Sequence, residues 1–133
     1  MDKLLAIATG GAGGALLRYG ISGVAYRLLG ETFPWGTLAV NVMGCFLIGL
    51  LWGISERAPF LPNASIFLFT GILGGFTTFS TFGLETFNLF RDGEMMLGVV
   101  NILASNVACL VAVTLGFILA RMLPGPSGMG GAS

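Results

Sequence analysis

The sequence has no histidine, only two cysteines and few charged residues, and each shortage excludes a kind of chemistry. Without histidine there is no serine-histidine-aspartate triad, no HExxH zinc site and no imidazole pH switch. Charged residues make up 9% of the chain and the formal net charge is zero, so we expect no nucleic acid partner. Cys45 and Cys109 lie in separate apolar segments without metal-binding spacing, which indicates thiols used for packing.

Apolar residues are abundant: they make up 55% of the 133 residues, more than in soluble domains. Four apolar segments reach the length of roughly 20 residues that a bilayer crossing needs, and they cover residues 4–29, 35–54, 64–90 and 95–122. Charges and prolines fall in the short connections. We therefore predict an all-α membrane protein with four transmembrane helices in residues 1–123, followed by a flexible tail at 124–133.

Two glycine pairs are spaced for close helix packing. Gly10 and Gly14 in the first segment, and Gly49 and Gly53 in the second, have the GxxxG interval. Small residues let helix backbones approach closely in lipid. The pairs predict tight helix contacts rather than a phosphate site, because no strand precedes GGAGG and no GK[ST] follows it.

The most unusual stretch is GGFTTFSTFG, from Gly74 to Gly83 in the third segment. Two glycines followed by β-branched residues weaken a helix, so we predict that the third helix is broken near its middle. Non-helical backbone at membrane depth is tolerated only where protein or a polar cavity surrounds it. The stretch is therefore expected to form the wall of a small ion site.

Polar residues in the segments are few: Asn41, the threonines and serine of the third segment, Asn101, Ser105 and Asn106. Helical spacing places Asn101, Ser105 and Cys109 on one stripe, with Asn106 pointing elsewhere. A phenyl ring has a positive edge, so Phe79 and Phe82 beside hydroxyls and amides suit a neutral anion pathway. The alternative is that both rings simply pack in a core.

Two further features belong to the candidate site: a pair of backbone carbonyls and one arginine. Carbonyls freed by a break near Gly74 and Thr77 could bind sodium, unless threonine hydroxyls and neighbouring helices satisfy the backbone. Arg18 lies partway along the first segment, where a cation is costly. It either extends its side chain to the interface or serves a vestibule.

Positive charge is nearly balanced between the two membrane sides. If all four segments span, Lys3, Arg57 and Arg121 lie on one side and Arg27 and Arg91 on the other. Positive charge normally sets orientation, so this chain has little reason to prefer one. We therefore predict dual topology and an antiparallel homodimer about a two-fold axis in the membrane plane.

The chain resembles the CrcB/Fluc fluoride channels through GGAGGALLRY at 10–19, GTLAVNVMGCFLIG at 36–49 and GGFTTFSTFGLE at 74–85. The resemblance covers essentially all four segments. It implies a dual-topology homodimer in the lipid of the bacterial inner membrane that exports toxic cytoplasmic fluoride passively through two pores. It also implies one structural Na⁺ at the centre of the dimer interface.

The resemblance assigns residues position by position. It places Asn41, Thr37, Phe79, Ser80, Thr81, Phe82, Ser105, Arg18 and Glu85 along the fluoride pathway, and gives the sodium to the carbonyls of Gly74 and Thr77. Asn101 stands where family members are expected to carry tyrosine, and Cys109 where a small polar residue occurs. These two differences concern the outer part of the pathway.

Two other classes fit parts of the sequence. A small multidrug transporter also has four helices, but it needs a membrane carboxylate, and the first segment has none. A non-transporting assembly protein would use the glycines and polar residues only to join helices. No convincing pair of nucleophile and base is present, so the chain is not expected to be an enzyme.

Overall fold

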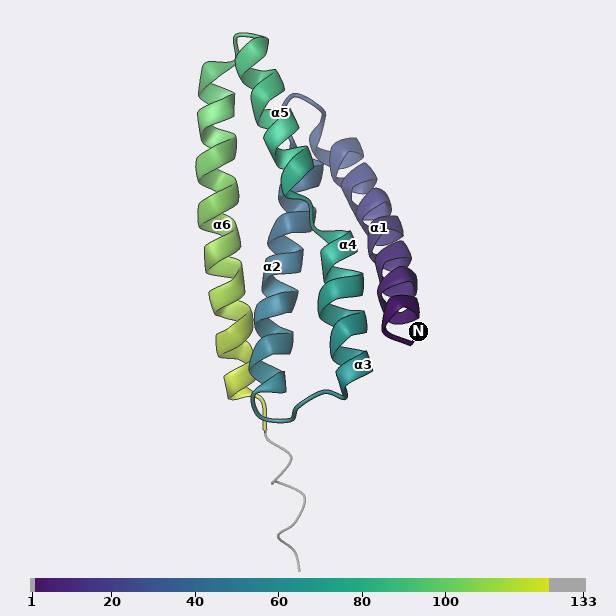
Figure 1. Ribbon diagram of the computed structural model, residues 1–133. Coiled ribbons are helices and arrows are strands. Elements are labelled where there is room, and N and C mark those ends of the chain that lie inside the picture. The colour runs from purple at the N-terminus through teal and green to yellow at the C-terminus, as the bar shows by residue number, and fades with distance from the viewer. Residues whose placement is uncertain (1, 125–133) are drawn as a thin grey trace, which may run out of the picture.

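The computed structural model describes residues 2–124, which form helices and short connections and no strand (Figure 1). Four spans are long and apolar enough to cross a membrane. They are α1 (Asp2–Leu29), α2 (Trp35–Ser55), the third span (Pro62–Arg91) and α6 (Met95–Met122). The predicted four-helix membrane class is confirmed, with span ends within two residues of expectation. The predicted tail lies outside the described residues apart from Pro124.

The spans alternate in direction. In Figure 1 the start of α1, the connection after α2 and the end of α6 lie at the bottom, and the other two connections lie at the top. Each top connection contains a glycine in the left-handed region, Gly30 with φ 88° and Gly93 with φ 85°, where a side chain would be strained. Because the directions alternate, α2 and α6 run the same way.

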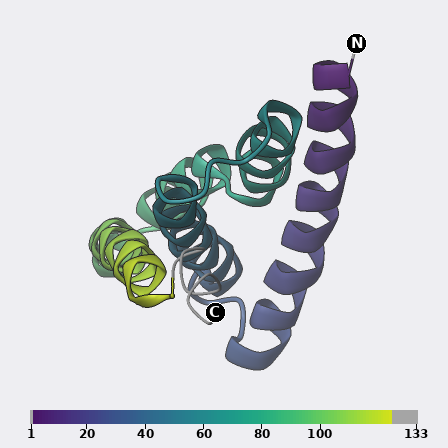
Figure 2. The same ribbon diagram turned by 90° about the horizontal axis from the view of Figure 1, so that it is seen from below.

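The four spans form an open arrangement rather than a closed bundle. Within residues 2–124, α2 packs against both α1 and α6, whereas α6 contacts only α2 and the last part of the third span. Figure 2, seen from below, shows α1 standing far from α6. Many large apolar side chains therefore remain exposed, as expected for a surface that meets lipid or another copy.

Both predicted glycine pairs lie at helix contacts. A Cβ at Gly10 would come within 2.7 Å of the Phe67 carbonyl oxygen, and one at Gly14 would collide with the carbonyl of Ile72. On α2, a Cβ at Gly49 would collide with the carbonyl of Val113 on α6. These glycines are buried and let the backbones touch, as the GxxxG spacing predicts.

The third span contains several helical pieces: α3 (Pro62–Ser65), the π-helix η1 (Ile66–Leu73), α4 (Gly74–Phe76) and α5 (Phe79–Arg91). The backbone leaves helical geometry at Thr77, with ψ 157°, and at Thr78, with φ −150° and ψ 114°. Gly74 itself is helical, so the non-helical residues come after the glycine pair. The axis bends by only 15°, so a break in the sense of a kinked span is not confirmed.

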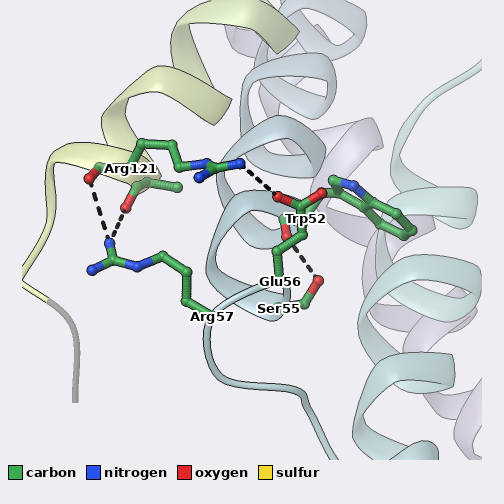
Figure 3. A network of polar contacts seen from close by, with 6 residues as sticks. Trp52, Ser55, Glu56, Arg57 and Arg121 are labelled. Atoms are coloured by element: carbon green, nitrogen blue, oxygen red, sulfur yellow. Dashed lines mark hydrogen bonds and ion pairs between the residues drawn. The ribbon is translucent and has the colours of Figure 1, made fainter. Parts of the chain in front are cut away.

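Polar contacts tie the lower ends of α2 and α6 together (Figure 3). The Arg57 guanidinium donates to the carbonyl oxygens of Ala120 at 3.0 Å and Leu123 at 2.6 Å. The Arg121 guanidinium lies 3.3 Å from the Glu56 carboxylate. A cation that caps the last carbonyls of a helix also complements its dipole. These contacts hold the two parallel helices in register.

Candidate functional site

An open groove of about 440 Å³ lies between α2, the third span and α6. Its lining consists of apolar side chains, amides, hydroxyls and thiols, with no charged residue among them. The lining residues are Asn41, Gly44, Cys45, Ile48, Phe69, Leu73, Gly74, Thr77, Thr78, Phe79, Phe82, Ser105, Asn106, Cys109 and Leu110. Of the predicted site residues, the groove thus brings together Asn41, Phe79, Phe82 and Ser105 with Gly74 and Thr77.

Asn41 holds the non-helical backbone of the third span. Its Nδ2 donates to the Thr78 carbonyl oxygen at 3.0 Å, and its Oδ1 accepts the Thr78 amide at 2.8 Å. A buried backbone group without a partner costs free energy comparable to a lost hydrogen bond. One amide side chain on α2 therefore satisfies both backbone groups of a residue that has left the helix.

Thr78 also begins α5. Its hydroxyl accepts the Thr81 amide at 3.2 Å, as an N-cap does, and donates to the Thr81 hydroxyl at 2.9 Å. The Ser80 hydroxyl lies 3.4 Å from the same oxygen. Ser80 and Thr81 are exposed and do not line the groove, but they form a hydroxyl cluster at its edge.

The carbonyls of Gly74 and Thr77 lose their usual helical donors. In an α-helix each carbonyl accepts the amide four residues later. The amide of Thr78 donates to Asn41 instead, and the amide of Thr81 donates to the Thr78 hydroxyl. Two carbonyls on adjacent turns are thus left without the amide that helical geometry would supply.

Phe79 and Phe82 form a ring pair on the groove. Their centroids lie 5.3 Å apart and their planes are tilted by 40°. Phe82 is buried, with 8% of its surface exposed, whereas Phe79 is 81% exposed. Phe82 is anchored within this chain, and Phe79 projects beyond it.

A buried polar ladder supports the wall behind Phe82. The Ser105 hydroxyl donates to the side-chain Oδ1 of Asn101 at 3.3 Å, and the Asn101 Nδ2 donates to the Thr86 hydroxyl at 2.9 Å. The Thr86 hydroxyl donates to the backbone carbonyl oxygen of Phe82 at 2.7 Å. Thr86 was missed by sequence reasoning, although its i+4 position after Phe82 could have indicated it.

The predicted stripe on α6 needs a correction. Ser105 and Cys109 line the groove, but Asn101 is only 1% exposed and lies behind it. Asn106, which was expected to point elsewhere, lines the groove. Two adjacent stripes of α6, Ser105 with Cys109 and Asn106 with Leu110, therefore form the wall.

Glu85 and Thr37 form a separate cluster. The Glu85 Oε1 atom accepts hydrogen bonds from the Tyr26 hydroxyl at 2.7 Å and the Thr37 hydroxyl at 2.8 Å. Its Oε2 atom is buried and has no partner among residues 2–124. Tyr26 and Glu85 also line a second cavity of about 390 Å³. This cluster is not part of the groove.

Arg18 lies on α1, away from the groove. It is half-buried, and its guanidinium forms no hydrogen bond or ion pair with the described part of the chain. Only its backbone carbonyl is used, as the acceptor for the Ser22 hydroxyl at 2.7 Å. The structure does not join Arg18 to the other site residues, and its role stays a prediction.

Comparison with known proteins identifies the family. The model of the CrcB-like proteins, described as camphor resistance (CrcB), matches residues 5–117. The chain belongs to this family. The CrcB resemblance drawn from the three sequence motifs is thereby confirmed, and the multidrug-transporter alternative is wrong.

Curated CrcB relatives match over nearly the whole chain. A protein named fluoride-specific ion channel FluC from Citrifermentans bemidjiense is 49% identical over 124 residues, which are 92% of this chain and 100% of that protein. The protein of the same name from Salinibacter ruber is 50% identical over 125 residues, or 94% of each chain. The one from Nitrosococcus oceani is 43% identical over 123 residues. The CrcB family is thus one of ion channels, and the chain is a multi-pass membrane protein, not an enzyme.

Proposed function

We propose that the protein is a fluoride-specific channel that lets toxic fluoride leave the cytoplasm passively. The observation that carries this proposal is an uncharged groove of aromatic rings, hydroxyls and amides in a chain 49% identical to a protein named for fluoride. Fluoride is small and accepts hydrogen bonds strongly, so such donors can replace its water. No fixed cation traps the ion, which conduction requires.

The residues have distinct roles in this proposal. Phe79 and Phe82 present positive ring edges to the ion. The hydroxyls of Ser80 and Thr81 serve as donors along the path, and Ser105 lines it with a hydroxyl that would turn from Asn101 to the ion. Asn41 holds the Thr78 backbone through one Nδ2 hydrogen and Oδ1, and its second Nδ2 hydrogen serves as a donor to the path.

Glu85, Thr37 and Arg18 are proposed to lie toward the ends of the pathway. The support for Glu85 and Thr37 is their hydrogen bond and the cavity that Glu85 lines beyond the groove. A carboxylate oxygen that is buried without a partner is costly, so a hydrogen-bond donor from a second copy is expected to reach Glu85 Oε2.

A second, oppositely inserted copy is proposed to complete the groove. Phe79 is 81% exposed, and the hydroxyls of Ser80 and Thr81 face outward at membrane depth. Polar groups there need protein partners or a water-filled path. An antiparallel homodimer would cover both exposed sets and create two equivalent pores, and the near balance of positive charge permits it.

Sodium is proposed to bind at the dimer centre through the carbonyls of Gly74 and Thr77. The residues fit the ion, since both carbonyls have lost their helical donors and unwound carbonyls coordinate sodium in membrane proteins. Two carbonyls from each copy would hold it, and the ion would supply a charge that joins the copies. Within residues 2–124 no group of three or more histidine, cysteine, aspartate or glutamate side chains could hold a metal ion.

Efflux from proteoliposomes tests the channel proposal. Vesicles loaded with fluoride and containing the purified protein should release it rapidly once a potassium ionophore balances charge, and chloride-loaded vesicles should retain chloride. A protein that only assembles would leave fluoride inside as long as empty vesicles do, and that result would remove the proposal.

Sodium exchange tests the cation. Dialysis of the detergent-solubilised protein into N-methylglucamine salts should lower its thermal stability and shift it from dimer to monomer in size-exclusion chromatography. Restored sodium should reverse both changes, whereas a dimer indifferent to sodium would count against the site.

A further inference from the structure

Cys45 and Cys109 form a pair on the wall of the groove, although they belong to different spans. Both are free and half-buried, and both line the groove. The sequence predicts that both thiols serve packing, and the structure adds that they share one groove. Sequence separation hid the pair, because only the packing of α2 on α6 brings the sulfurs together.

The register of α2 against α6 also places the two cysteines at the same level. α2 and α6 run in the same direction, and Gly49 packs directly on the backbone of Val113. Gly49 and Val113 each follow one of the cysteines by four residues, which is about one helical turn. One turn back along both helices from a backbone contact, the two thiols must lie at the same level.

Two sulfurs without further ligands restrict what can bind. No group of three or more histidine, cysteine, aspartate or glutamate side chains in residues 2–124 could hold a metal, so a four-ligand zinc site is excluded. Soft thiolate ligands select soft cations. A divalent ion held by two thiolates is electrically neutral, which suits an uncharged groove at membrane depth.

We propose that Cys45 and Cys109 together bind one soft divalent cation of the mercury(II) type, and that the bound ion closes the groove to fluoride. On binding, each S–H bond breaks, each sulfur forms a bond to the metal, and two protons leave to water. No electrons are transferred. The closing of the groove rests on the proposed channel function, whereas the binding of the ion does not.

Alkylation of the unmodified full-length protein tests binding. After addition of Hg²⁺ and removal of excess, mass spectrometry should find one mercury per chain, and an alkylating reagent should leave both cysteines unmodified. Protection of only one thiol, or of neither, would overturn the proposal. Because this measurement needs no variant, a folding defect cannot obscure it.

Single variants test whether both sulfurs are needed. Mercury on the parent protein should survive a wash with 2-mercaptoethanol and be removed by a dithiol. Cys45→Ser and Cys109→Ser should each lose mercury in the monothiol wash, since one sulfur then holds it alone. Retention by either variant would overturn the two-thiol site.

Fluoride efflux tests the closing of the groove, with each variant compared with its own rate before Hg²⁺. The parent should lose its fluoride efflux on Hg²⁺ addition and regain it with a dithiol, while C45S/C109S should not respond. Fluoride efflux that stays unchanged while mercury is bound would contradict the proposal that the bound ion closes the groove. A protein that binds mercury between both thiols but never conducts fluoride would contradict the channel function and leave the binding site supported.

Discussion

At the scale of single residues, the two rings of the groove are supported differently. Phe82 is buried with 8% of its surface exposed and has the Thr86 ladder behind it, whereas Phe79 is 81% exposed. Substitution of Phe82 therefore disturbs packing as well as any contact with an ion. A substitution of Phe79 tests the ion contact without the packing effect, because its side chain contributes little to the core of its own chain.

We expect Phe79→Ile to abolish fluoride efflux from proteoliposomes while the dimer still assembles. Isoleucine keeps apolar bulk but has no aromatic edge with positive potential. Phe82→Ile should have the same effect on efflux. Phe87→Ile is the matched control, since Phe87 lies on the same helix, is 60% exposed and does not line the groove. Normal efflux in both ring variants would contradict the edge-on contact.

Asn41→Leu should destabilise the protein by about 1–3 kcal/mol, because the Thr78 amide and carbonyl would both lose their partner. Leucine has a similar volume, so the loss measures hydrogen bonding rather than a cavity. Thermal unfolding in detergent checks it. Asn106→Leu is the control: Asn106 is exposed and donates only to Ile102 on its own helix, so its stability change should be small.

At the scale of elements, backbone contact decides how the spans join. α1 meets the third span at Gly10 and Gly14, and α2 meets α6 at Gly49, each time with a carbonyl where a Cβ would be. Carbonyls in a helix cannot move aside as a flexible side chain can. Added methyl groups must therefore separate whole helices.

Gly14→Ala and Gly13→Ala form a matched pair within GGAGG. A Cβ at Gly14 would meet the Ile72 carbonyl and come within 2.9 Å of the Phe76 amide nitrogen, whereas nothing lies within 4 Å at Gly13. We expect Gly14→Ala to cost about 1–3 kcal/mol of stability through overpacking. Gly13→Ala should be neutral or gain up to about 1 kcal/mol from helix propensity. Equal melting temperatures would contradict this packing.

At the scale of the whole molecule, the open arrangement of the spans and the near balance of positive charge both favour pairing with a second copy. α6 does not contact α1 within residues 2–124, and the groove faces outward. In the proposed channel, a single copy would provide only part of a pathway. A partner of opposite orientation would supply the rest.

Charge bias tests that orientation. Asp2→Lys with Asn63→Lys adds positive charge to one end of the spans, and Glu31→Lys with Glu94→Lys adds it to the other. Because positive residues stay on the cytoplasmic side, each double variant should insert one way and lose fluoride efflux in cells. Coexpression of the two should restore it. Full efflux from one double variant alone would contradict the antiparallel dimer.

Much of the site could be anticipated from residue type and spacing. GGFTTFSTFG marked the non-helical backbone, and Asn41, Phe79, Phe82 and Ser105 do meet at one groove. A break is predicted near Gly74 and Thr77, and the non-helical residues are Thr77 and Thr78, because the Asn41 side chain stabilises extended backbone there. A distant hydrogen bond outweighed local propensity.

The sequence by itself determined the membrane class, the number of spans and the glycine contacts, because apolar length and small-residue spacing are local properties. Only the tertiary structure decided that Asn41 holds Thr78, that Asn101 supports Phe82 through Thr86, and that Cys45 and Cys109 line the same groove. These partners lie on different spans. Their meeting depends on helix direction and register, which no local pattern of residues specifies.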